Sequence, residues 1–205
     1  MTDAPRLHRR AALTGLAALG LAAAAPAPLL AEPKLLLGVQ FLGAENAPVQ
    51  MIEYVSLTCP HCARFHVDVY PEIKRDYIDT GKVRLEFREV YFDRVGLWAA
   101  MLARCGGEDR YFGFISLLLE KQEQWSRSED LMGEFKRLGR QGGLSDAEVE
   151  ACLSDAEGQR ALVEMYQEYY EDPRLTGTPT LIVDGEKVEN PFRNLRTAID
   201  AALGS

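Results

Sequence analysis

A short apolar segment that runs directly into a Cys-x-x-Cys motif limits the possible folds of this chain more than any other feature. Residues 49–57 (VQMIEYVSL) are rich in β-branched and apolar side chains and predict a buried strand. Cys59, Pro60, His61 and Cys62 follow almost at once. A strand that ends in two cysteines at this spacing predicts an α/β fold with the thiols at the end of a sheet.

The segment after the motif predicts a helix and then a second strand. Phe65, Val69 and Ile73 recur at helical spacing, and Pro71 is expected to kink that helix because proline lacks a backbone N–H. Residues 83–92 (VRLEFREVYF) alternate between apolar and polar side chains as a strand does. The order strand, helix, strand implies a parallel pair with a right-handed crossover.

The rest of the chain is helical until a hairpin near its end. Residues 95–172 contain helical patterns separated by Gly-rich or Ser/Asp capping signals. The sequence TGTPT (176–180) then leads into a short apolar run and Asp184-Gly185, a strong signal for a two-residue hairpin. Residues 193–203 predict a final amphipathic helix.

The N-terminal region has the layout of a secretory signal. Three arginines lie among the first ten residues, and residues 11–31 carry no charge and consist mostly of Ala and Leu. We predict a cleavable signal peptide over residues 1–31, with cleavage after Ala31. The alternatives are cleavage after Ala27 and an uncleaved membrane anchor. Arg9-Arg10 is compatible with twin-arginine export.

Without residues 1–31 the chain has 20 Lys and Arg against 30 Asp and Glu, a net charge of −10. Such an acidic protein should repel nucleic acid and anionic membrane surfaces, so we expect neither as a partner. Export would also place all four cysteines where disulfides persist.

The motif itself favours redox chemistry. A first cysteine at a helix N-terminus meets unpaired backbone N–H groups and the positive end of the helix dipole, which stabilise a thiolate at Cys59. Pro60 suits the first helical turn, and His61 is a second candidate for lowering the pKa of Cys59. A stabilised thiolate makes the disulfide a better oxidant. Cys62 should be the buried partner.

Metal binding and structural stapling are weaker interpretations of the two thiols. A structural zinc site needs four ligands, but Cys105 and Cys152 stand alone and the exported part has only His61 and His66. A Cys59–Cys62 bond closes almost no loop, so it would stabilise little. A copper-binding thiol module is the alternative from another functional class, without a Met-rich or His-rich tract in its favour. We expect no metal or other cofactor.

The stretch EYVSLTCPHCARFH (53–66), together with TGTPT, resembles the DsbA-like thiol–disulfide oxidoreductases of the thioredoxin superfamily. The resemblance covers essentially the whole chain after the predicted signal. It implies a thioredoxin-like domain made of residues 32–94 and 173–205, interrupted by an inserted all-helical domain of residues 95–172.

The resemblance also implies roles for individual residues. Cys59 would be the nucleophile, Cys62 the resolving cysteine and His61 a group that tunes the thiolate. Pro179 would be a cis-proline packed against the disulfide, and it would offer backbone groups to a substrate together with Thr178. From the residues alone, Pro179 could equally be a proline at a strand edge.

Other polar and cysteine residues are assigned less firmly. Glu53 occupies a position where the family often has a buried acid, which could relay protons to the resolving cysteine. Without the resemblance, the sequence favours a solvent-facing position on the strand for Glu53. His66 is either a surface residue or a proton donor. Cys105 and Cys152 would form a second, structural disulfide, or remain two buried free thiols.

The implied function is a periplasmic enzyme that introduces disulfides into exported proteins and is reoxidised by a quinone-linked, DsbB-like membrane partner. Only about 17 residues separate Ala31 from the first predicted strand. These leave no room for the N-terminal dimerisation domain that an isomerase or reductase often adds, which favours the oxidase. We also expect a monomer. Thr178 keeps an isomerase or reductase open as the alternative, because the most oxidising family prototype has an aliphatic residue there.

Overall fold

The computed structural model describes residues 1–2 and 35–204, so the predicted signal peptide lies outside the described residues except for Met1 and Thr2. Within 35–204, five strands form one mixed sheet in the order β1-β3-β2-β4-β5. The strands are β1 (Gln40–Leu42), β2 (Val49–Val55), β3 (Val83–Glu89), β4 (Thr180–Val183) and β5 (Glu186–Lys187). The predicted parallel pairing of β2 with β3 is confirmed, and the other pairs are antiparallel.

The helix after the cysteines is broken, as the proline predicted. It consists of α1 (Pro60–Asp68), α2 (Tyr70–Ile73) and a π-helix η1 (Lys74–Ile78). The break falls at Val69, two residues before Pro71, where φ widens to −119° while ψ stays helical at −48°. Without an N–H, Pro71 cannot continue the helical hydrogen-bond ladder.

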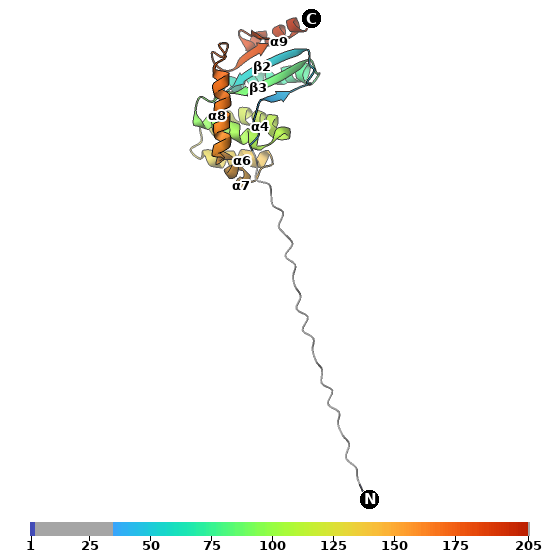
Figure 1. Ribbon diagram of the computed structural model, residues 1–205, viewed down its shortest axis with the longest axis vertical. Helices are drawn as coiled ribbons and strands as arrows, with labels where there is room; N and C mark the ends of the chain where they lie inside the picture. The colour runs from blue at the N-terminus through green and yellow to red at the C-terminus, as the bar shows by residue number, and fades with distance from the viewer. Residues whose placement is uncertain (3–34, 205) are drawn as a thin grey trace. The chain divides into compact units, whose positions relative to one another are not determined.

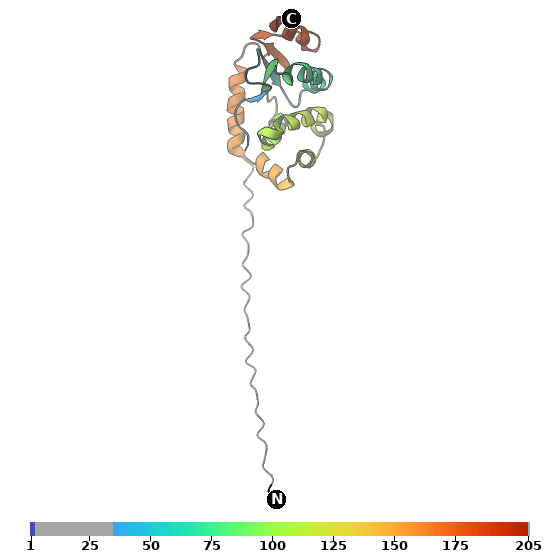
Figure 2. The ribbon, with the colours of Figure 1, turned by 90° about the vertical axis from the view of Figure 1, so that its right-hand side faces the viewer.

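The long helical region lies between β3 and β4. Its helices are α3 (Arg94–Cys105), α4 (Glu108–Glu120), α5 (Gln122–Ser126), α6 (Leu131–Gln141), α7 (Asp146–Leu153) and α8 (Ala156–Tyr170). Figures 1 and 2 show α8 running from the vicinity of α6 and α7 up to the sheet. This element order is the one that a thioredoxin-like domain with a helical insertion requires, and the exact division into two domains stays a prediction.

A buried ion pair attaches the helical region to the sheet. Arg104 on α3 and Glu89 at the end of β3 are 0% and 1% exposed, and two guanidinium nitrogens of Arg104 donate to the carboxylate of Glu89. Tyr111 on α4 donates to the same carboxylate at 2.7 Å. A third nitrogen of Arg104 donates to the backbone carbonyls of Leu36 and Gly38. Because every charge is paired and hydrogen-bonded, this interior site tolerates burial.

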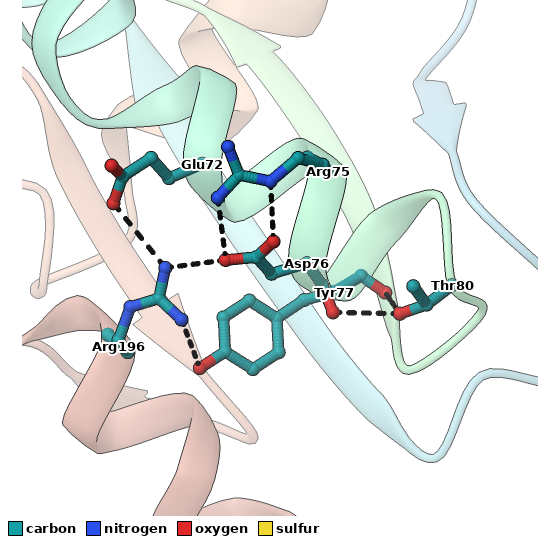
Figure 3. A network of polar contacts seen from close by, with 6 residues as sticks. All are labelled: Glu72, Arg75, Asp76, Tyr77, Thr80 and Arg196. Atoms are coloured by element: carbon teal, nitrogen blue, oxygen red, sulfur yellow. Dashed lines mark hydrogen bonds and ion pairs between the residues drawn. The ribbon is translucent and has the colours of Figure 1, made fainter.

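The C-terminal part covers the sheet with α9 (Pro191–Ala202), which follows the predicted hairpin. Asp184 and Gly185 both have positive φ, as a tight two-residue turn requires. Figure 3 shows Arg196 of α9 between Glu72 and Asp76, with Tyr77 beside it. These contacts fasten α9 to the segment that follows the cysteine helix. None of the helices within the described residues combines the length and the apolar character that a membrane crossing needs.

Candidate active site

The two cysteines of the motif lie where β2 gives way to α1. Cys59 is the N-cap residue with an extended backbone (φ −81°, ψ 118°), and Pro60 is the first residue of the helix. Cys59 is half-buried, whereas Cys62, almost one turn along, is 1% exposed. The predicted location of a thiol at a helix N-terminus is therefore observed.

The surroundings of Cys59 stabilise its thiolate. The pKa of Cys59 is lowered to about 5, first because the Cys62 thiol donates a hydrogen bond to it. The Thr178 side chain and the backbone N–H groups of Cys62 and His61 lower the pKa further, and partial burial opposes them. At neutral pH, Cys59 is therefore ionised.

The second thiol has the opposite character. Burial raises the pKa of Cys62 far above its usual range, and the hydrogen bond and charge of its Cys59 neighbour raise it further. The pair thus consists of a partly exposed thiolate, Cys59, and a buried thiol, Cys62. A substrate can therefore reach the sulfur of Cys59, whereas Cys62 can react only with its neighbour Cys59.

The loop before β4 brings Thr178 and Pro179 to the cysteines. The Thr178–Pro179 peptide bond is cis, and Cys59 Sγ lies 3.4 Å from the Thr178 carbonyl oxygen, to which it donates when it is protonated. Within the described residues, the buried hydroxyl of Thr178 has no hydrogen-bond partner. A hydroxyl that donates to Sγ stabilises the thiolate, which is the direction in which the Thr178 side chain shifts the pKa of Cys59.

A polar cluster that the sequence did not reveal anchors this loop. Tyr54 on β2 donates to Asp172 at 2.7 Å, and Arg174 donates to the same carboxylate from both Nε and Nη2. Arg174 also reaches the carbonyl of Gly185 in the hairpin turn. The hydrophobic pattern of β2 gives no sign that Tyr54 has this role, because its acceptor Asp172 lies 118 residues away.

Glu53 is buried, so the solvent-facing alternative is wrong. Its side chain is 1% exposed, and within the described residues its Oε2 has no hydrogen-bond partner. Burial raises the pKa of Glu53 to about 8, which leaves the acid mostly protonated at neutral pH. Its assignment as a proton relay to Cys62 stays a proposal.

His66 is also buried, which excludes the surface position. It is 5% exposed, its Nε2 lies 3.1 Å from Ser116 Oγ on α4, and its ring stacks on Tyr70 at 4.4 Å. Burial lowers the pKa of His66 to about 4. The neutral ring therefore packs α1 against the helical region.

His61 is exposed at the first turn of α1, and its backbone N–H contributes to the low pKa of Cys59 independently of the ring. We predict that His61→Ser raises the pKa of Cys59 by about one unit or less, because solvent screens an exposed imidazole and the N–H remains. The pH dependence of Cys59 alkylation measures the shift. If the alkylation profile of Cys59 is unchanged, the His61 ring does not affect the pKa of Cys59 and the prediction is wrong.

The other two cysteines are joined in the structure. A disulfide connects Cys105 on α3 with Cys152 on α7 across a Cα–Cα distance of 6.1 Å, and both residues are buried. In the part of the chain that the structure describes, His, Cys, Asp and Glu side chains do not gather in groups of three or more that could hold a metal ion.

Known proteins share this fold. Residues 38–201 match the thioredoxin family. The crystal structure of Wolbachia pipientis alpha-DsbA1 superposes with a TM-score of 0.74 at 30% identity, over 81% of this chain and 91% of that one. A probable disulfide bond formation protein D of Bacillus anthracis is 28% identical over 176 residues, covering 80% of this chain and 78% of the relative.

A putative protein-disulfide oxidoreductase of Rickettsia bellii is 34% identical over 164 residues. That alignment covers 79% of this chain and 63% of the relative, so the chain spans less than two thirds of that protein's length. The match to the thioredoxin family nevertheless extends over most of the sequence, and the Wolbachia pipientis structure shares its fold over 91% of that chain. The chain therefore belongs to the thioredoxin family and, within it, to the DsbA-like thiol–disulfide oxidoreductases.

Proposed function

We propose that this protein oxidises pairs of thiols in exported polypeptides through a Cys59–Cys62 disulfide. The observation that carries the proposal is the placement of the two thiols: Cys59 is half-buried at the N-terminus of α1 and Cys62 is buried behind it. In this arrangement the pKa of Cys59 is lowered to about 5 and that of Cys62 is raised. A stabilised Cys59 thiolate favours the reduced enzyme, so the disulfide form of the enzyme readily oxidises the thiols of a substrate. The low pKa also makes Cys59 a good leaving group when a product disulfide is released.

The proposed setting is the periplasm. The N-terminal signal layout supports export by a cleavable signal peptide, with the twin-arginine route as one possibility. The enzyme would act as a monomer, and a quinone-linked membrane protein of the DsbB type would restore the disulfide after each cycle. The acidic composition supports polypeptides, and not nucleic acid, as substrates.

The equilibrium of the protein with glutathione tests the direction of electron flow. The protein, with the Cys105–Cys152 disulfide intact, is incubated in buffers of varied ratio of reduced to oxidised glutathione, and the fraction with free Cys59 is determined by alkylation and mass spectrometry. We expect half-reduction at a potential above that of glutathione. Half-reduction at a potential well below it would contradict an oxidase.

An isomerase or reductase is the second candidate, and Thr178 is the residue that favours it. The resemblance associates an aliphatic residue at this position with the strongest oxidant. In this structure, however, the Thr178 side chain lowers the pKa of Cys59 and so adds to the stability of the reduced form. The glutathione equilibrium separates the two candidates, because an isomerase must remain reduced under conditions in which the oxidase is a disulfide.

A further inference from the structure

Gln122 connects the helical region to the backbone of the reactive cysteine. It is the first residue of α5, 5% exposed, and its Nε2 donates to the carbonyl of Leu57 at 2.7 Å and to the carbonyl of Cys59 at 3.0 Å. Both partners are acceptors, so only the amide nitrogen, with its two hydrogens, satisfies them together. The contact spans more than 60 residues of sequence, and neither motif nor spacing indicated it.

The two carbonyls bracket the turn that delivers Cys59 to the helix. The carbonyl of Cys59 also accepts the N–H of Ala63 at 3.2 Å, which is the first hydrogen bond of α1. Thr58, which lies between Leu57 and Cys59 in the sequence, donates from its Oγ1 to Asp93 Oδ2 at 3.0 Å. The turn is therefore held from two directions, by α5 and by the start of α3.

The corner that carries Gln122 is itself fixed. Trp125, one turn further along α5 and fully buried, donates from its indole nitrogen to the carbonyl of Leu118 on α4 at 2.8 Å. The buried indole therefore holds α5 against α4 close to Gln122.

We propose that Gln122 is a positioning residue that fixes the backbone of Cys59 and so holds the Cys59 sulfur at the N-terminus of α1, where the helix stabilises a thiolate. The physical reason is that the interactions of an N-cap residue depend on its backbone angles. Gln122 holds the carbonyl of the cap residue Cys59 and the carbonyl of Leu57, two residues before it. The helical region would then contribute to the reactivity of the thiol, and not only cover it. The inference rests on the proposed function only in taking Cys59 as the reactive thiol.

The test replaces the amide by an apolar group of similar length. We expect Gln122→Met to raise the pKa of Cys59, read from the pH dependence of its alkylation by iodoacetamide, by about one unit. The matched control is Gln124→Met, which alters an exposed glutamine on the same helix and should leave the profile unchanged. The charged residues of the adjoining groove stay as they are in both variants: Arg64, Asp68, Glu120, Glu123 and Arg127.

The outcomes separate positioning from simple support. A folded Gln122→Met protein with lower thermal stability but an unshifted alkylation profile would overturn the inference. If Gln122→Met does not fold, Gln122→Glu retains the shape, and its buried carboxyl, protonated beside two carbonyl oxygens, can donate to only one of them, so a smaller rise in the pKa of Cys59 is expected and an unchanged profile overturns the inference. Alkylation needs no protein substrate, so a protein that fails to oxidise peptides would contradict the proposed function without affecting this result.

Discussion

Cys59→Ser and Cys62→Ser should each abolish disulfide transfer to a reduced dithiol peptide, because neither variant can form the Cys59–Cys62 disulfide, and only Cys62→Ser should still form a mixed disulfide when an oxidised disulfide is supplied. In the proposed cycle, a substrate thiolate attacks Cys59 Sγ, the Cys59–Cys62 bond breaks, and Cys62 takes up a proton because its pKa is raised. A second substrate thiolate then attacks the substrate sulfur of the mixed disulfide, and Cys59 leaves as a thiolate. Two electrons pass from the peptide to the enzyme.

The Cys62→Ser variant is informative because a serine hydroxyl can still donate to the Cys59 thiolate. Incubated with glutathione disulfide, it should accumulate one stable glutathione adduct at Cys59, visible by intact mass. The Cys105→Ala/Cys152→Ala protein is the matched control and should retain full transfer, with a free energy of unfolding lower by up to roughly 4 kcal/mol. Residual transfer by Cys59→Ser would place the nucleophile elsewhere.

Glu53→Gln should stabilise the protein increasingly as the pH rises from about 4.5 to about 8. A carboxyl whose pKa is raised in the folded state stabilises the fold fully below its unfolded pKa, and that stability is lost as the pH rises through the folded pKa. For Glu53 this range extends from 4.5 to about 8. At about 1.4 kcal/mol per pKa unit, the full difference between variant and parent approaches roughly 5 kcal/mol.

Denaturant unfolding of the oxidised proteins at several pH values measures this difference. Oxidation removes Cys59 and Cys62 from the titration, so their pKa shifts do not contribute. Glu164→Gln, on the exposed face of α8, is the control and should show no comparable trend. A difference between Glu53→Gln and the parent that does not change with pH would mean that Glu53 is ionised in the folded protein.

The parts of the fold that depend on local chemistry follow from the sequence. A β-branched apolar run predicted β2, helical spacing predicted α1, and Asp184-Gly185 predicted the hairpin, because each signal lies within a few residues of its effect. The edge strand β1 was not predicted. It has three residues, and its pairing with β3 depends on residues that follow it by more than 40 positions.

The candidate site also combines features that local sequence predicts with features that depend on distant segments. The sequence by itself predicted a cysteine at a helix N-terminus with a buried partner three residues on, because Cys-x-x-Cys before a helix fixes these relations over four residues; their roles as nucleophile and resolving cysteine stay predictions. Only the tertiary structure decided that Glu53 and His66 are buried, that Tyr54 and Arg174 hold Asp172 in the loop before Pro179, and that Gln122 reaches the carbonyl of Cys59. Desolvation and hydrogen bonds between distant segments depend on which surfaces meet when the helical region packs on the sheet, and no local pattern of residues encodes that meeting.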